Sequence, residues 1–143
     1  MASNPFFSRE FPSSLEAMPE VLGHALTVLA DRHWIDPGHE FSARLCLEEA
    51  MVNAVTHGNK CNHARRVRVE MAEEGDLCHI SIFDEGHGFN PDCVPPPDTV
   101  HTGGRGLCLI KHYMERVRFD DAGNRLEMWL RRCHTQPAGG QSA

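Results

Sequence analysis

Glu49 and Asn53 are polar residues in a stretch, residues 41–59, that otherwise has the apolar spacing of a buried helix. At about 100° per residue they fall between two apolar strips, whereas Arg44 and Glu48 lie on the solvent-facing side. The strips comprise Phe41, Leu45 and Val52, and Cys46, Leu47, Ala50 and Ala54. Burying an acid and an amide without partners costs several kcal/mol. The pair therefore indicates either a site for a polar ligand, a metal or water, or an ion pair across the core, and the helix alone does not decide between them.

Asp84 is a second candidate site residue, because it ends an alternating strand pattern and precedes Gly86 and Gly88. Its carboxylate is a fixed acceptor beside backbone that another molecule can approach closely. Such an acceptor suits an amino group such as that of adenine. A strand followed by Asp and Gly is also a common turn, so this motif alone leaves both interpretations open.

Residues 103–106, GGRG, precede a helical pattern. Glycines at this place offer unblocked backbone N–H groups and a positive helix end, which together form a typical cradle for phosphate oxygens. The alternative is a simple glycine-rich hinge.

Glu49 and Asn53 supply the chemistry that these two glycine-rich segments lack. The amide oxygen of Asn53 is a hard ligand able to hold Mg²⁺ that bridges a triphosphate, since Mg²⁺ keeps waters and phosphates as its other ligands. Glu49 is placed to accept a proton from an attacking hydroxyl or water. The three motifs, in this order, predict chemistry on a nucleotide phosphate.

The composition is that of an ordinary globular chain, with 143 residues, 41% hydrophobic and 24% charged. A net charge of −6 without a basic run argues against a general nucleic-acid binder. No secretory leader pattern is evident, and no stretch reaches the roughly eighteen apolar residues of a membrane span. We therefore expect a cytoplasmic protein without a membrane or nucleic-acid partner. The six cysteines contain no CxxC pair and are expected to be free buried thiols.

Two helices are expected in the first half of the chain, after an extended lead at 6–11. The first begins at a serine cap in the pair 13–14 and runs to about Trp34. The second begins at the Asp-Pro pair 36–37 and stops at Gly58. It is the helix that carries Glu49 and Asn53.

The period of the apolar residues changes to two after residue 65, which predicts strands. Turns rich in Gly, Asp and Asn separate paired strands, and a proline-rich segment separates the two pairs. The expected elements are strands at 67–71 and 78–82 around a turn at 73–76, an irregular segment at 90–103, a helix at 107–115, and strands at 116–120 and 125–131 around a turn at 121–124.

These motifs resemble a known family. EEAMVNAVTHGN, FDEGHGF and GGRGLCLI look like the N, G1 and G2 boxes of the GHKL ATPase/kinase superfamily. The HG after the N box and the small size resemble most the anti-sigma-factor serine/threonine kinases of partner-switching systems, the RsbW/SpoIIAB type. The resemblance covers about residues 11–132. It implies a Bergerat fold of the α/β (α+β) class, a two-layer sandwich of a mixed, mostly antiparallel sheet with about three helices on one face.

The resemblance also implies a function. A protein of this kind binds ATP with Mg²⁺, phosphorylates a serine or threonine on a small STAS-domain antagonist, sequesters a sigma factor or similar target, and commonly forms a homodimer. Residues 1–134 would be one ATP-binding kinase domain, with a lid at about 90–103 and a disordered tail at 135–143.

Individual roles follow from the matched positions. Glu49 would be the general base and Asn53 the Mg²⁺ ligand, with His57 lining the phosphate end of the ATP site. Asp84 would bind the adenine amino group. The remaining ATP-binding residues would be Gly86 and Gly88, which let the base approach, and Gly104, Arg105, Gly106 and Leu107 of the second glycine box.

The lid is the main departure from the family pattern, because residues 90–104 contain no lysine or arginine. This favours an alternative function, a nucleotide-dependent anti-sigma-type binding module without kinase activity. A histidine-kinase catalytic domain acting in trans is a further alternative, but the chain has no phosphoacceptor helix pair. His57, Cys61 and His63 match no strong zinc spacing, so a polar loop is the better interpretation there.

Overall fold

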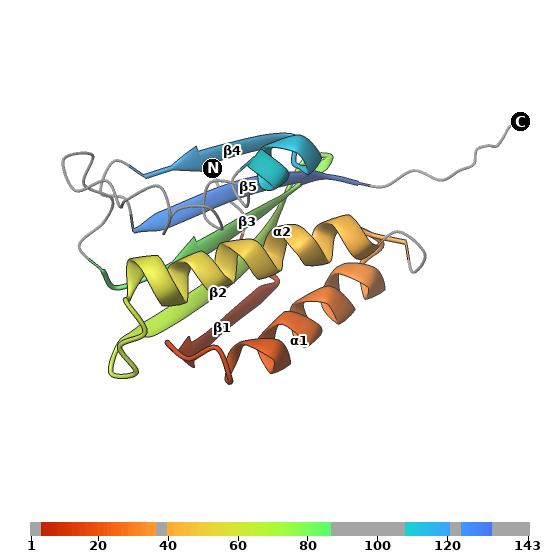
Figure 1. The fold of residues 1–143 in the computed structure, drawn as a ribbon. Helices are drawn as coiled ribbons and strands as arrows, with labels where there is room; N and C mark the ends of the chain where they lie inside the picture. The colour runs from red at the N-terminus through yellow and green to blue at the C-terminus, as the bar shows by residue number, and fades with distance from the viewer. Residues whose placement is uncertain (1–3, 37–39, 87–107, 121–123, 133–143) are drawn as a thin grey trace, which may run out of the picture.

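The computed structural model describes residues 4–36, 40–86, 108–120 and 124–132. These residues form a five-stranded sheet with helices packed on one of its faces (Figure 1). The elements are β1 (Phe7–Pro12), α1 (Met18–Asp31), α2 (Glu40–Asn53), the π-helical segment η2 (Ala54–Gly58), β2 (Arg66–Glu74), β3 (Leu77–Phe83), β4 (Arg116–Phe119) and β5 (Arg125–Arg131). A further helical segment, 108–113, precedes β4.

The strands follow the order β1-β2-β3-β5-β4, and each described pairing is antiparallel. β2 and β3 form the expected hairpin, in which Glu74 pairs with Leu77 across a turn. Gly75 adopts φ +62°, a conformation that favours glycine. The α+β sandwich is thus confirmed, and the expected mixed, mostly antiparallel sheet is antiparallel in each described pairing.

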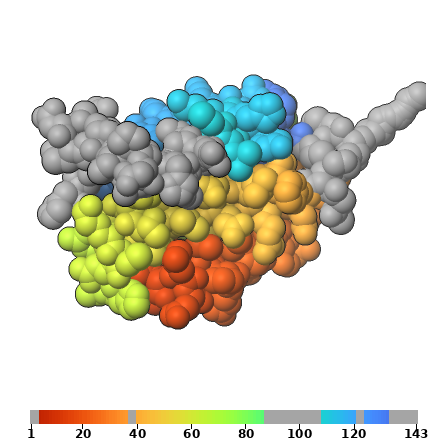
Figure 2. All heavy atoms as spheres, viewed as in Figure 1, coloured from red at the N-terminus to blue at the C-terminus, as the bar shows by residue number. Residues whose placement is uncertain are grey.

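The core lies between the sheet and the helices. α1 and α2 lie side by side over one sheet face, as the space-filling view also shows (Figure 2). Ile110 and Met114 of the segment after 107 join the same cluster. The sheet contributes alternate residues, including Val67, Val69 and Met71, so the period-two pattern correctly predicted their inward face. Among the described helices, none is long and apolar enough to span a membrane.

The first helix begins later than the expected serine cap. α1 starts at Met18 because Pro19 occupies its first turn, where a missing N–H costs nothing. Ser14 instead closes the preceding turn, with its Oγ accepting a hydrogen bond from the Glu16 N–H at 3.1 Å. Ser13 is fully buried, and its hydroxyl lies 3.4 Å from the Val55 carbonyl oxygen that it faces.

The same helix ends at Asp31, before the expected Trp34, because His33 has φ +65°. Trp34 is buried in the core, and the guanidinium carbon of Arg132 lies 3.7 Å from the centre of the Trp34 ring. Arg132 also donates hydrogen bonds at 3.1 Å to the carbonyls of Arg32 and His33.

One of the two apolar strips assigned to the second helix was wrong. Phe41 is 67% exposed, and Leu45 and Val52 are only partly buried. A helix lying flat on a sheet buries a single stripe, and here that stripe is the other strip. The buried stripe includes the four residues of that strip together with Ala43 and Met51, and so comprises Ala43, Cys46, Leu47, Ala50, Met51 and Ala54.

The cysteines were also predicted with partial success. Cys46 and Cys78 are free and buried, and burial raises their pKa to about 11 and about 12, which leaves them unreactive thiols. Cys61 and Cys108 are free but exposed, against expectation, because Cys61 lies in the turn between η2 and β2 and Cys108 lies on an exposed position of the helical segment 108–113.

Candidate active site

Glu49 and Asn53 lie one turn apart on α2, are both partly buried, and each carry one buried oxygen without a partner among the described residues. Glu49 Oε1 and Asn53 Oδ1 are each buried and have no hydrogen-bond partner. Within the described ranges no cation pairs with Glu49, so the ion pair that the sequence left open is not found there. Burial, with a smaller contribution from the neighbouring Glu48, raises the pKa of Glu49. Two unsatisfied oxygens on one helix turn are the condition expected of a site that binds a polar ligand.

The helix that carries these oxygens changes its pitch immediately after Asn53. Residues of η2 form a π-helix, and the Thr56 hydroxyl donates to the Val52 carbonyl at 2.8 Å across the junction. Short π-helical turns in α-helices often lie at functional sites. His57 lies in this segment with an exposed side chain, and its place at a phosphate end stays a prediction.

Asp84 follows directly after β3 and is fixed on both sides. Its N–H donates to the Asn124 carbonyl at 3.0 Å, and its Oδ1 accepts from the Gly86 N–H at 2.8 Å. Burial raises the pKa of Asp84, opposed by the Gly86 hydrogen bond and the charge of Arg65. The hydrogen bond from Gly86 to the Asp84 side chain forms a turn, which is one of the two interpretations that the sequence left open for this motif. A carboxylate in such a turn keeps lone pairs for a further donor, so the two interpretations are compatible.

Gly58 joins the helix to Asp84. A Cβ at position 58 would overlap the Asp84 carboxylate, and a Cβ at Gly86 would overlap the Gly58 carbonyl. Both glycines are therefore required for the close packing of two backbone segments. The structure gives Gly86 this packing role, and its role in the approach of a base stays a prediction.

Asn59 is a residue that the sequence reasoning missed. Its side chain is fully buried, with Nδ2 donating to the Arg66 carbonyl at 3.0 Å and Oδ1 accepting from the Glu85 N–H at 2.7 Å. An asparagine after glycine at a helix end is usual, so only the long-range contacts distinguish this one.

The helix thus brings the predicted residues into one line. Glu49, Asn53 and Gly58 follow one another along α2 and η2, and Gly58 touches Asp84. From Glu49 to Asn53 the α-helix rises about 6 Å at 1.5 Å per residue. Gly88, Gly104, Arg105, Gly106, Leu107 and the lid at 90–103 lie outside the described residues, so their roles remain predictions.

A metal would depend on few protein ligands here. In the part of the chain that the structure describes, no group of three or more His, Cys, Asp or Glu side chains is placed to hold an ion. A Mg²⁺ ion bound through one amide oxygen and the phosphates of a nucleotide does not need such a group. The unpartnered Oδ1 of Asn53 fits that kind of site.

Comparison with known proteins identifies the class to which this fold and site belong. The model of the histidine kinase-like ATPase domain family matches residues 11–130, and the chain belongs to this family. An ATPase domain implies a site for ATP. The chain is also 27% identical over 96 residues to the serine/threonine-protein kinase BtrW of Bordetella bronchiseptica, a match that covers 62% of this chain and 68% of that protein.

Proposed function

We propose that this protein is an ATP- and Mg²⁺-dependent serine/threonine protein kinase of a cytoplasmic partner-switching system. The observation that carries the proposal is the pair of buried, unpartnered oxygens of Glu49 and Asn53 on the helix that contacts Asp84. Similarity to a protein named as a serine/threonine kinase supports the type of reaction.

Asn53 is the residue that would hold the magnesium ion through Oδ1. When bound, Mg²⁺ neutralises charge on the transferring phosphate and orients it. The protein's part is to present one hard oxygen from a rigid helix, and the buried residues of α2 hold that helix in place.

Glu49 is the proposed general base. Its Oε1 has no partner to release before it accepts the proton of a serine or threonine hydroxyl. The raised pKa makes the carboxylate a stronger base than an exposed glutamate. Asp84 is the proposed acceptor for the adenine amino group, held in place by its turn to Gly86.

The proposed protein substrate is a STAS-domain antagonist, and the proposed target is a sigma factor or a similar regulator that the kinase sequesters, acting as a homodimer. These partners are those of the family that the three motifs resemble.

The decisive experiment measures transfer of radiolabelled phosphate from ATP to a cognate STAS-domain protein. We expect Glu49→Gln to lower the rate by about 10²- to 10⁴-fold with nucleotide binding retained, since positioned acid–base catalysis contributes that much. Glu48→Gln is the matched control, because Glu48 is the adjacent carboxylate and has no assigned role. Transfer that survives Glu49→Gln would refute the role of Glu49.

A nucleotide-dependent binding module without transfer is the second candidate. The absence of lysine and arginine from residues 90–104 favours it, because little side-chain charge there would offset a triphosphate. A partner recovered from the reaction with the added mass of one phosphoryl group would exclude this candidate.

A further inference from the structure

We propose that Asn59 is a positioning residue of the nucleotide site, which holds Asp84 in place and so sets affinity and selectivity for the adenine base. The inference rests on the proposed function, because it assigns Asp84 to base recognition. It concerns binding, whereas Glu49 and Asn53 concern the reaction.

The side chain of Asn59 connects the end of η2 with the start of β2 and with the segment after β3. Its amide nitrogen bonds the carbonyl of Arg66 at the start of β2, and its oxygen receives the N–H of Glu85 after β3. Asn59 itself follows the last residue of η2. A fully buried amide with a partner at each end has one orientation, because turning it would leave a buried donor and acceptor unpaired.

Glu85 completes a closed set of hydrogen bonds with the same partners. Its Oε1 accepts from the Arg66 N–H at 2.7 Å, while its own N–H is held by Asn59. Arg66 therefore gives its carbonyl to Asn59 and its N–H to Glu85. The segment after β3 is thus tied to β2 both directly and through Asn59.

Asp84 lies inside this arrangement. The peptide group that follows it is fixed by Asn59 Oδ1, and the peptide group before it is fixed by the Asn124 carbonyl. Its carboxylate lies against Gly58, the residue that precedes Asn59 in the chain. Asn59 therefore controls both the backbone that carries Asp84 and the surface on which its carboxylate lies.

Ending the helix does not require the Asn59 side chain. The Asn59 N–H bonds the Ala54 carbonyl at 2.8 Å, which closes the last π turn through backbone alone. The chain then reverses through Lys60 and Cys61, at φ +53° and +56°. The buried amide is thus available for the contacts to Arg66 and Glu85.

Glu49 and Asn53 do not depend on these contacts. α2 is anchored ahead of η2 by buried residues that include Leu47, Ala50 and Met51. Loss of the Asn59 side chain should therefore disturb the base end of the site and leave the reacting end in place. The expected signature is a change of nucleotide affinity at unchanged turnover under saturation.

The test measures the dissociation constants of ADP and GDP by calorimetry, and the saturated rate of phosphoryl transfer, for the full chain. Asn59→Ala should weaken the binding of ADP about tenfold, which is the effect of losing one buried hydrogen bond and leaving its partner unpaired. The same substitution should reduce the ratio of the affinities for ADP and GDP. The saturated rate should change less than about twofold. Asn62→Ala is the matched control, because Asn62 is an exposed asparagine in the same loop whose side chain bonds only the local Ala64 N–H among the described contacts.

Two further variants keep the test decisive. Glu85→Ala removes only the bond to the Arg66 N–H from an exposed side chain, so it should fold and weaken ADP in the same direction by about two- to fivefold. Gly58→Ala should weaken ADP more than either, because its Cβ displaces the Asp84 carboxylate. The positioning role is overturned if folded Asn59→Ala binds ADP with wild-type affinity, or if Glu85→Ala does so when Asn59→Ala does not fold. It is also overturned if the saturated rate falls while the affinity for ADP stays at the wild-type value. A wild-type protein that binds neither nucleotide refutes the proposed function, and the inference with it.

Discussion

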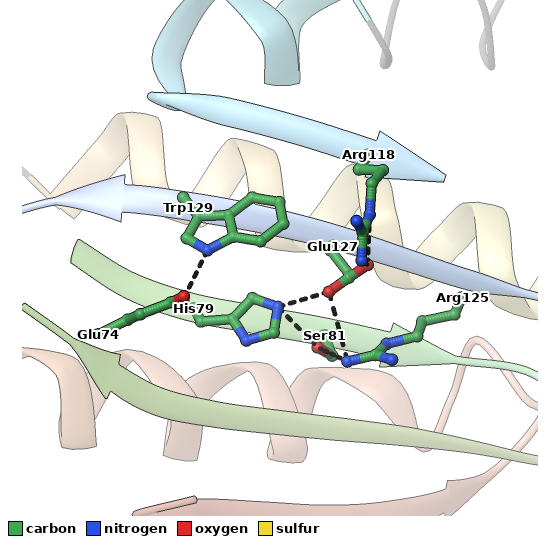
Figure 3. A network of polar contacts seen from close by, with 7 residues as sticks. All are labelled: Glu74, His79, Ser81, Arg118, Arg125, Glu127 and Trp129. Atoms are coloured by element: carbon green, nitrogen blue, oxygen red, sulfur yellow. Dashed lines mark hydrogen bonds and ion pairs between the residues drawn. The ribbon is translucent and has the colours of Figure 1, made fainter. Parts of the chain in front are cut away.

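Glu127 on the outer face of the sheet and Glu49 on α2, which packs on the other face, are two carboxylates with opposite surroundings. Glu127 is 3% exposed on β5 and is surrounded by two arginines and a histidine (Figure 3). Its oxygens lie 2.6 Å from Arg118 Nη2, 2.8 Å from His79 Nε2 and 3.4 Å from Arg125 Nη2. Burial alone would raise the pKa of Glu127, but the hydrogen bonds from Arg118 and His79 and the charge of Arg125 outweigh it and hold the pKa below its ordinary value. Glu49 has none of these partners, and its pKa is raised.

The difference shows where the fold stabilises charge and where it leaves charge available. The outer face of the sheet, away from α1 and α2, is covered by its own side chains (Figure 3). Trp129 stacks on His79 with ring centres 4.7 Å apart, and Arg116 lies 4.3 Å over the Trp129 ring. Glu127 connects the side chains of this layer through its contacts with Arg118, His79 and Arg125, and so has a structural role. The buried Oε1 of Glu49 carries a free energy cost that the described contacts do not offset, which is common for residues whose role is chemical.

Removal of the two carboxylates should therefore have different consequences for stability. This difference is the largest effect on the free energy of unfolding that we expect. Glu127→Ala should lower the free energy of unfolding by about 2 kcal/mol, because it removes charged hydrogen bonds and leaves His79 partly buried without its partner. We set this below the usual cost of breaking a buried pair because the Arg118 side chain is 66% exposed. Glu49→Ala should change the same free energy by less than about 0.5 kcal/mol, or raise it.

Urea unfolding at neutral pH measures both changes. Glu115→Ala is the control for a general effect of losing an acid, because Glu115 pairs with Arg131 at an exposed position 3.1 Å away. An equal loss in Glu127→Ala and Glu49→Ala would remove the basis of the comparison.

The dependence of stability on pH should separate the same two groups. Glu127 has a folded-state pKa below its ordinary value of 4.5, so its contribution is present above pH 4.5 and is lost as the pH falls through the lowered pKa. Glu49 has a raised folded-state pKa, so its ionised form destabilises the fold at neutral pH, and this cost disappears as the pH falls through that raised pKa.

Free energies of unfolding measured from about pH 7 to pH 3 test these signs, because the ordinary carboxyl pKa of 4.5 lies inside that range. Glu127→Gln should flatten the loss of stability at the acid end. Glu49→Gln should be stabilised relative to wild type at pH 7 and lose that advantage in acid. An acid limb that is unchanged in Glu127→Gln would show that Glu127 is not ionically stabilised.

The sequence predicts the sheet better than it predicts this difference. The strand predicted at 125–131 is confirmed as β5, whereas the burial of Glu127 on it was not predicted. The burial of Glu127 arises from its cross-strand neighbours, since it pairs with Ser81 on β3 and Arg118 on β4. Register between distant strands is not contained in the local pattern.

The candidate site was predictable where a residue type conflicted with its surroundings. Glu49 and Asn53 were found because polar groups interrupt an apolar helix, and the structure leaves their oxygens unpartnered. The π-helical turn was not predicted, because its residues keep an ordinary helical spacing in sequence. The role of Asn59 was not predicted either, since its partners at 66 and 85 are brought to it only by the fold.

The smallest expected effect concerns Trp129, which shares the outer face with Glu127. Trp129→Phe keeps an aromatic ring to stack on His79 but loses the hydrogen bond from Nε1 to Glu74 Oε1, 2.7 Å long (Figure 3). Glu74 is exposed and can bond water instead, so the free energy of unfolding should fall by only about 0.5 kcal/mol. Repeating the substitution in a Glu74→Ala background isolates the hydrogen bond, because there it should cost less. Tryptophan emission then reports from Trp34 alone. A loss in Trp129→Phe as large as that in Glu127→Ala would mean that the tryptophan, and not the carboxylate, is the anchor of this face.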